Sequence, residues 1–298
     1  MWRTCWLSSQ VAVLPDGRRL GYSIVGSGRP IVYFHGTASS RLEVFLLKEL
    51  AKNSKLQLIG VDRPGYGLST FKQRISLQDF NACVNFLMDH LGIERFGVLG
   101  WSGGGAFALA YLSFFPERTT KAVIAGAPSL PFDASTAHNM PFARYIIQIP
   151  FIGQIAMSHM RQQVLKAHDD IPVFLESKQG KHLLHACSKS DLKFFSDPLW
   201  MGLMYQSMAE AFRQGTRGVQ AVLEEHQLFL KPWSFSFAKV PADKLFIWHG
   251  AEDKTCLVSN AHLIFGSVAG SHLEIFEKKG HCVMFDNLEK LGALFVDD

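Results

Sequence analysis

The sequence lacks closely spaced cysteines. Its five cysteines, Cys5, Cys83, Cys187, Cys256 and Cys282, are odd in number and far apart, without a Cys-x-x-Cys pair. A disulfide framework or a zinc site requires paired or clustered ligands, so the sequence indicates neither. We therefore expect a reducing compartment, the cytoplasm, and a protein that needs no metal and no other cofactor.

Long apolar runs and blocks of like charge are also missing. The amino terminus has no apolar segment of the length that a signal peptide needs, and no stretch reaches the roughly 18 uncharged residues of a membrane span. The 30 Lys and Arg residues are spread among 26 Asp and Glu residues, which leaves a formal net charge of +4. These absences argue against a membrane span and against a nucleic-acid partner. They leave the oligomeric state open.

What the sequence has is an alternation of short apolar segments and longer amphipathic ones. A hairpin is expected over residues 10–25, around Pro15-Asp16-Gly17. The apolar segments that follow are typical of strands and lie at 31–34, 56–61, 96–99, 122–125, 244–248 and 273–276. Helical patterns separate them, near 40–53, 76–91, 104–115 and 258–266 and from about 282 onward. This alternation predicts an α/β fold, in which a mostly parallel twisted sheet carries helices on both faces.

The alternation is interrupted between residues 128 and 237, where the pattern is helical and apolar without clear strands. We interpret this segment as a helical cap inserted between two parts of one α/β core, residues 1–127 and 238–298. The segment is rich in aromatic and methionine side chains, most of which are expected to pack the cap itself. Those that face a pocket would make it apolar, as small-molecule sites usually are.

Ser102 is the most informative single residue. It stands in Gly100-Trp101-Ser102-Gly103-Gly104, directly after the expected strand at 96–99 and directly before the expected helix at 104–115. Serine is a weak nucleophile, so an enzyme that uses one must expose it in a tight turn beside a general base and oxyanion donors. The flanking glycines let a strand and a helix approach closely around such a turn. The Gly-x-Ser-x-Gly pattern in this context predicts that Ser102 is a nucleophile.

A base and an acid are sought where other strands end, because catalysts gather at the carboxyl edge of a parallel sheet. His35, His249 and His281 follow strand-like segments, and we assign the base to His281, in the loop before the last helix. Asp253, just past the strand at 244–248, can accept the other imidazole N–H. Its neighbour Glu252 is more typical of a solvated loop.

Two nearby residues are given structural roles. Asp286 is expected to support the first turn of the last helix, where negative charge is favourable. Cys282 is expected to be a small buried residue and not a thiol nucleophile.

The order Ser102, Asp253, His281 along the chain is that of the α/β-hydrolases, and the sequence from about residue 10 to the end resembles the capped members of that family. His35-Gly36-Thr37 resembles the oxyanion loop of the family. The segment 62–69, Asp-Arg-Pro-Gly-Tyr-Gly-Leu-Ser, resembles its glycine-rich loop, and we expect its Asp and Arg to satisfy backbone groups.

The oxyanion would be stabilised by the backbone N–H groups of Thr37 and Gly103, and the Thr37 hydroxyl is a further candidate donor. His35 and Trp101 are the remaining candidates for the site. Either could contact substrate, although His35 is better suited to holding its loop through hydrogen bonds. For Trp101, an orientation toward the pocket and one toward the core are equally open.

The predicted function is hydrolysis of a small or medium, largely apolar ester, thioester or related acyl compound through an acyl-enzyme intermediate. Serine at position 102 argues against the dehalogenase and epoxide hydrolase branches of the resembled family, which carry aspartate there. Peracid formation, acyl transfer, carbon–carbon bond hydrolysis and amide cleavage on the same triad stay open, because a fold does not fix a substrate. The alternative from another class is a ligand receptor that keeps the triad with little turnover.

Overall fold

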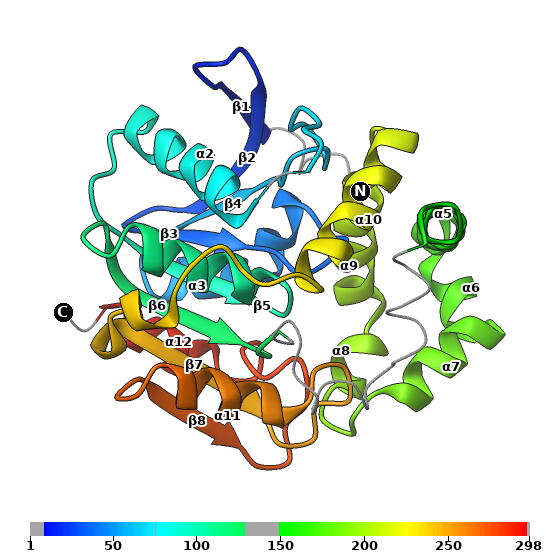
Figure 1. Cartoon of the computed structure of the whole chain (residues 1–298). Coiled ribbons are helices and arrows are strands. Elements are labelled where there is room, and N and C mark those ends of the chain that lie inside the picture. The colour runs from blue at the N-terminus through cyan, green and yellow to red at the C-terminus, as the bar shows by residue number, and fades with distance from the viewer. Residues whose placement is uncertain (1–8, 75, 129–148, 297–298) are drawn as a thin grey trace.

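A single sheet of eight strands organises the part of the chain that the computed structural model describes, residues 9–74, 76–128 and 149–296 (Figure 1). The strand order is β1-β2-β4-β3-β5-β6-β7-β8. The bounds are β1 Ser9–Val13, β2 Arg19–Gly26, β3 Arg29–Phe34, β4 Leu56–Val61, β5 Phe96–Trp101, β6 Thr119–Ala125, β7 Leu245–Gly250 and β8 His272–Phe276. Strand β2 is antiparallel to β1 and to β4, and the other neighbouring pairs are parallel. The predicted hairpin and the mostly parallel sheet are confirmed.

Side chains alternate between two cores, one on each face of the sheet. In β3, Val32 and Phe34 contribute to one core, whereas Ile31 and Tyr33 contribute to the other. The first face is covered by α2 (Leu77–His90), α3 (Gly104–Phe114) and α11 (Val258–Ser267). The second is covered by η2 (Arg41–Leu47), α1 (Lys48–Asn53) and α12 (Leu288–Val296). Because every central strand is buried on both faces, its sequence is almost continuously apolar.

Between β6 and β7 the described residues form helices and no strand. These helices are α5 (Pro150–Asp169), α6 (Ile171–Glu176), α7 (Lys178–Ala186), α8 (Leu192–Phe195), α9 (Pro198–Ala211) and α10 (Thr216–Phe229), and the short turns η4 (Phe237–Lys239) and η5 (Ala242–Lys244) precede β7. Figure 1 shows α5 to α10 gathered on one side of the molecule. The buried apolar residues of these helices form a core that also includes Ala38 and Tyr66. Both belong to the sheet unit, by which we mean the eight strands with their covering helices and connecting loops. Residues 129–148 of the expected cap lie outside the described residues, and its status as a separate unit stays a prediction.

A buried ion-pair network fixes α9 to the sheet unit. The Arg41 guanidinium lies 2.7 Å from Asp62 Oδ2 and 2.8 Å from Glu210 Oε1 of α9, and all three side chains are buried. The Asp62 carboxylate also accepts the backbone N–H groups of Arg41 and Leu68. The expectation that this aspartate satisfies backbone groups is therefore confirmed. Buried charges of this kind are costly to leave unpaired, so α9 is held in one position.

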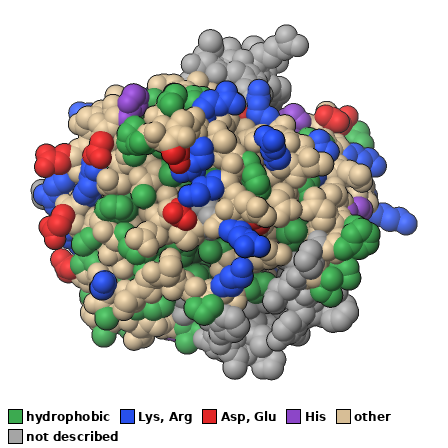
Figure 2. All heavy atoms as spheres, turned by 45° about the horizontal axis from the view of Figure 1, so that its top comes forward, with side chains coloured by type: hydrophobic (Ala, Val, Ile, Leu, Met, Phe, Trp, Pro, Cys, Tyr) green, Lys and Arg blue, Asp and Glu red, His purple; other side chains and the backbone are tan. Residues whose placement is uncertain are grey.

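The distribution of surface charge and the lengths of the helices concern two possible partners, nucleic acid and membrane. On the face shown in Figure 2, basic, acidic and apolar side chains are interspersed. Within the described residues, each helix is too short or too polar to cross a lipid bilayer.

The structure corrects the start of the last helix. The pattern predicts a helix from about residue 282, but α12 begins at Leu288 and a series of turns precedes it. Cys282, Val283 and Met284 are completely buried in this turn segment. An apolar run that is buried on all sides cannot be told from a helix by its periodicity. Cys282 is thus the buried residue that we expected.

Asp286 likewise does not act as predicted. It precedes α12, and its carboxylate pairs with Lys193 and, at 3.2 Å, with Lys279. Lys193 pairs with Oδ1 and Lys279 with Oδ2, so the carboxylate joins the turn segment to α8, and the acidic residue in the first turn of α12 is Glu289 instead.

Replacement of Gly104 by alanine tests how tightly α3 meets β3. A Cβ at position 104 would lie 2.0 Å from the Phe34 carbonyl oxygen, whereas a Cβ at Gly266 in α11 meets nothing within 4 Å. We expect G104A to lower the free energy of unfolding by about 1–3 kcal/mol through overpacking. The control G266A should raise it by about 0.5–1 kcal/mol, as Ala does in place of Gly within a helix. Urea unfolding measures both, and equal effects would contradict the close approach.

Candidate active site

Ser102 occupies a strained turn between β5 and α3. Its φ of 53° lies in the left-handed region, which non-glycine residues seldom adopt. Such a conformation costs on the order of 1–3 kcal/mol and persists only where the surroundings enforce it. Here the Ser102 N–H donates to the Ala125 carbonyl at 2.9 Å, and a Cβ at Gly100 would lie 2.6 Å from the Gly104 carbonyl oxygen. Ser102 remains partly exposed while its neighbours are buried.

His281 and Asp253 form a buried pair, 2.8 Å between Nδ1 and Oδ2. The other carboxylate oxygen of Asp253 accepts the backbone N–H groups of Thr255 and Cys256, at 2.7 and 2.8 Å. Burial opposes the charged form of each partner, but their mutual attraction prevails. It raises the pKa of His281 and lowers the pKa of Asp253. Because both oxygens of Asp253 are occupied by donors, the carboxylate holds the imidazole in one orientation.

The imidazole lies at the same sheet edge as Ser102. A Cβ at Gly126 would be 3.1 Å from His281 Cε1 and Nδ1, and Gly126 directly follows Ala125, which binds the Ser102 N–H. The Trp101 indole N–H donates to the His281 carbonyl at 3.0 Å. The structure therefore brings the neighbours of Ser102 against the His281–Asp253 pair, as the strand ends predict.

His249, at the end of β7, is committed to holding a loop. Its Nδ1 accepts the Ala127 N–H at 3.0 Å, so its proton resides on Nε2 and is donated to the Cys256 carbonyl at 2.9 Å. Burial lowers the pKa of His249 and keeps the ring neutral. His249 therefore supports the Asp253 loop, and its ring nitrogens are not available as a base.

Three buried side chains hold the loop His35-Gly36-Thr37. Glu43 Oε1 accepts the Gly36 N–H at 2.7 Å, and Arg63 donates to the His35 and Gly36 carbonyls at 2.7 and 2.6 Å. His35 itself donates from Nδ1 to the Gly36 carbonyl at 2.9 Å, because a carbonyl oxygen can only accept. Burial lowers the pKa of His35 and favours its neutral form. Burial also raises the pKa of Glu43. The expected structural roles of His35 and of Arg63 agree with these bonds.

The two expected oxyanion residues lie side by side. A Cβ at Gly103 would be 2.1 Å from Thr37 Oγ1, so a side chain there would require the Thr37 hydroxyl to move. Since Glu43 already occupies the Gly36 N–H, the next amide in the loop, that of Thr37, is the one left for an oxyanion. The pair Thr37 and Gly103 therefore keeps its predicted role as a proposal.

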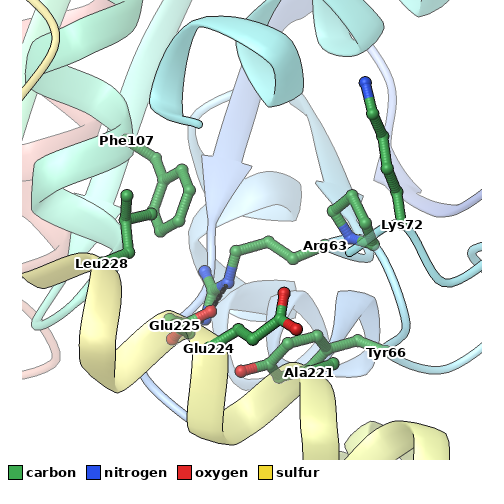
Figure 3. Close-up of a pocket in the computed structure, with 9 residues that line it drawn as sticks. Arg63, Tyr66, Lys72, Phe107, Ala221, Glu224, Glu225 and Leu228 are labelled. Atoms are coloured by element: carbon green, nitrogen blue, oxygen red, sulfur yellow. Dashed lines mark hydrogen bonds and ion pairs between the residues drawn. The ribbon is translucent and has the colours of Figure 1, made fainter. Parts of the chain in front are cut away.

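Arg63 also connects this loop to α10. Its guanidinium pairs with Glu225, with Nη2 3.0 Å from Oε1, and lies 4.8 Å from the centre of the Phe107 ring. Figure 3 shows these side chains around the hollow that Arg63 and Glu225 line together with Tyr66, Phe107 and Leu228. A helix of the expected cap is thus bonded to the side chain that holds the loop His35-Gly36-Thr37.

Trp101 and His35 do not present a surface to a substrate. Trp101 is 2% exposed and packs against the His281 and Phe285 rings, and His35 is fully buried. Of the two orientations left open for Trp101, the structure shows the one toward the core. We therefore expect both residues to position the site and not to contact substrate.

Sequence reasoning missed Glu43 and Glu225, which support the loop, and Asp191, which contacts His281. All three are buried carboxylates, and Glu225 and Asp191 lie far along the chain from the residues that they bind. Glu43 alone gave a local signal, an acid inside the apolar segment 41–47.

Comparison with known proteins defines the class. Residues 29–288 match the family model described as alpha/beta hydrolase fold, so the chain belongs to the α/β-hydrolase family, and the predicted family and fold class are confirmed. It is 36% identical over 114 residues to the uncharacterized hydrolase YcgS of Bacillus subtilis, a match covering 38% of this chain and only 39% of YcgS.

Two further comparisons extend over most of the chain. It is 23% identical over 284 residues to the monoacylglycerol lipase abhd6-A of Xenopus laevis, covering 91% of this chain and 75% of the lipase. The esterase structure from Exiguobacterium antarcticum superposes with a TM-score of 0.66 at 21% identity, covering 96% and 97% of the two chains. The structural likeness extends the agreement in fold across the described helices and strands.

Replacement of Asp253 by asparagine tests the origin of the His281 titration. We expect D253N to lower the His281 pKa, because burial then opposes the imidazolium without its nearest carboxylate. NMR titration of the imidazole Cε1–H measures the change. E252Q, which alters the neighbouring exposed carboxylate, is the control and should leave the pKa where it is. An unchanged pKa in D253N would show that the pair does not govern the titration.

Replacement of Glu225 by glutamine tests the ion pair between α10 and Arg63, the side chain that holds the His35-Gly36-Thr37 loop. Removing one partner of a buried ion pair leaves the Arg63 charge uncompensated, so E225Q should lower the free energy of unfolding by about 3–5 kcal/mol. Glu224, the next residue, is only half-buried and accepts from the Arg74 N–H and the Gln220 amide. E224Q should cost less than about 1 kcal/mol in the same chemical denaturation experiment. Similar losses in the two variants would argue against a special role for the Arg63 pair.

Proposed function

We propose that this protein is a serine hydrolase that cleaves a small or medium, largely apolar ester, thioester or related acyl compound. The observation that carries the proposal is the strained, partly exposed Ser102 at the same sheet edge as the buried His281–Asp253 pair. A nucleophile in a tight turn, a base and an orienting carboxylate are the three parts that acyl transfer to serine requires. The family membership supports this reading without fixing the substrate.

The proposed reaction has two halves. Ser102 Oγ attacks the acyl carbonyl carbon while His281 Nε2 takes the hydroxyl proton, and Asp253 stabilises the resulting imidazolium. The backbone N–H groups of Thr37 and Gly103 donate to the oxyanion of the tetrahedral intermediate. The intermediate collapses as His281 returns the proton to the leaving alcohol or thiol, which leaves an acyl ester on Ser102. Water, deprotonated by His281, then attacks that ester, and the acid product leaves with Ser102 reprotonated.

The apolar character of the substrate rests on what surrounds Gly103. Two ring carbons of Phe229, the last residue of α10, would lie 3.3 Å from a Cβ at Gly103, and Phe229 also contacts the Phe107 ring. An aromatic side chain next to the proposed oxyanion donor favours an apolar acyl group. The match to a protein named monoacylglycerol lipase agrees with an acyl ester. The proposed cap, residues 128–237, would supply the remaining contacts.

Covalent labelling of Ser102 tests the proposal. A fluorophosphonate should add one adduct per chain to the wild type, located on Ser102 by peptide mass spectrometry, and S102A should take up none. The matched control S113A removes a serine from the neighbouring α3 helix and should label like the wild type. A panel of p-nitrophenyl esters of rising chain length then reports the preferred acyl group. Absence of both labelling and S102-dependent turnover would overturn the hydrolase proposal.

The same panel separates the alternatives. Labelling followed by a single turnover would favour a receptor that keeps the triad. Turnover that requires an added alcohol or hydrogen peroxide would indicate acyl transfer or peracid formation. Labelling without ester turnover directs the search to amides and to compounds cleaved at a carbon–carbon bond.

The pH dependence has a defined sign. His281 can accept the Ser102 proton only as a neutral imidazole, and the Asp253 carboxylate holds its pKa above the ordinary value of 6.5. We therefore expect kcat/KM to rise with pH through a pKa above 6.5 and to be lost on the acid side. An acid limb below 6.5, measured with a substrate that does not itself titrate there, would contradict this assignment.

A further inference from the structure

Asp191 brings a buried carboxylate from the expected cap into contact with the histidine loop. It lies between α7 and α8, and its side chain is buried. Its Oδ2 accepts the His281 N–H at 2.8 Å, and its Oδ1 accepts the Cys282 N–H at 2.9 Å. The Ser188 hydroxyl donates to Oδ2 at 2.8 Å. One carboxylate thus binds both backbone amides that frame the proposed base.

We propose that Asp191 is a positioning residue for the hydrolase reaction. It holds the His281 backbone so that the imidazole stays correctly placed between Asp253 and Ser102. This inference rests on the proposed function, since it assigns a role relative to His281 as the base. It also implies that a cap segment, and not the sheet unit alone, completes the active site.

The chemistry of the contact requires a carboxylate. The atoms facing the Asp191 oxygens are three donors, two backbone N–H groups and one hydroxyl, in a buried place. An ionised carboxylate accepts at both oxygens, whereas an amide presents a donor at one of them. There is also no room for a side chain at Gly280, where a Cβ would lie 2.0 Å from Asp191 Oδ2 and from Ser188 Oγ. The absence of a side chain at Gly280 therefore allows the Asp191 carboxylate to approach the backbone of the His281 loop.

The segment that carries Asp191 also contacts the loop of the orienting acid. Lys254, the residue after Asp253, donates from Nζ to the Cys187 carbonyl at 3.0 Å. On the other side of Asp191, the Phe194 ring lies 5.9 Å from the Phe285 ring. Residues 187–194 therefore bind the loop of the acid and the loop of the base together. A shift of this segment would move both relative to Ser102.

The charge of Asp191 acts on the His281 titration as well. The ionisable groups close enough to influence the His281 imidazole are Asp253 on the β7 loop, Asp191 on the expected cap segment, Glu43 on η2 and His249 at the end of β7. Burial opposes its protonation, and the carboxylates of Asp253, Asp191 and Glu43 favour it. The Asp191 negative charge thus contributes to the raised pKa of the base, in addition to its backbone bonds.

The test is Asp191→Asn in the full chain, compared with Asp169→Asn, a cap aspartate whose side chain is 83% exposed. We expect D191N to lower the rate of fluorophosphonate labelling of Ser102, and kcat for p-nitrophenyl butyrate, by about 10- to 100-fold with KM within about twofold, as a misplaced base does. The acid limb of kcat/KM should move to lower pH, because a negative charge next to the imidazole is lost. D169N should match the wild type in all three readouts.

The outcomes separate the two proposals. If the wild type itself is not labelled at Ser102, the proposed function fails. If the wild type is labelled and folded D191N has the wild-type labelling rate and acid limb, only the positioning role is overturned, whatever its melting temperature. Should D191N not fold, S188A keeps the carboxylate but removes the hydroxyl that orients it. About a threefold loss of labelling rate in S188A would support the proposal, and an unchanged rate would overturn it.

Discussion

The left-handed backbone at Ser102 is the constraint on which the rest of the structure depends. The chain must leave β5, expose one hydroxyl and enter α3 within the space that Gly100, Gly103 and Gly104 leave free. Side chains at any of the three would meet the Gly104 carbonyl, the Thr37 hydroxyl or the Phe34 carbonyl. The turn therefore fixes at once where the helix packs, where the loop after β3 lies and where a nucleophile can stand.

The turn is surrounded by buried polar residues that take no chemical step in the proposed reaction. Arg63 and Glu43 hold the His35-Gly36-Thr37 loop, Arg41 joins Asp62 to Glu210 of α9, and Asp191 holds the loop that carries His281. Removing each of these charges from water costs free energy, and that cost is offset only when every hydrogen-bonding and charged partner is in place. Such a network favours one arrangement of the loops over near alternatives. Three of its members, Glu210, Glu225 and Asp191, come from the helices and loops between β6 and β7, so the candidate site draws on that segment as well as on the sheet.

Much of the fold and the central residues could be predicted from the sequence, for definite physical reasons. Buried parallel strands are short and apolar, so their positions are visible, and the ends of parallel strands meet at one edge, which selects His281 and Asp253 from many candidates. Ser102 is recognisable in the sequence because the glycines that its turn requires lie next to it in the chain. The side-chain direction of Trp101 could not be predicted, because both faces of β5 are buried and periodicity does not distinguish them.

The remaining features depend on contacts between distant parts of the sequence. The start of α12 was misplaced because residues 282–284 are apolar and completely buried, whichever backbone they adopt. Asp191 looked like any acidic residue of the cap, since its partners His281 and Cys282 lie about ninety positions away. No local pattern records a hydrogen bond of that span. The residues that orient the site are therefore the part that only the structure reveals.

In the proposed reaction, Ser102 attacks an acyl carbonyl with His281 as its base. Rapid mixing with excess p-nitrophenyl butyrate, acid quenching within the first turnover and peptide mass spectrometry test it directly. We expect one butyryl group per chain, located on the peptide that contains Ser102, with the same group absent from H281A at the same time. Turnover of the ester without an acyl group on Ser102, or with the acyl group on another residue, would contradict it.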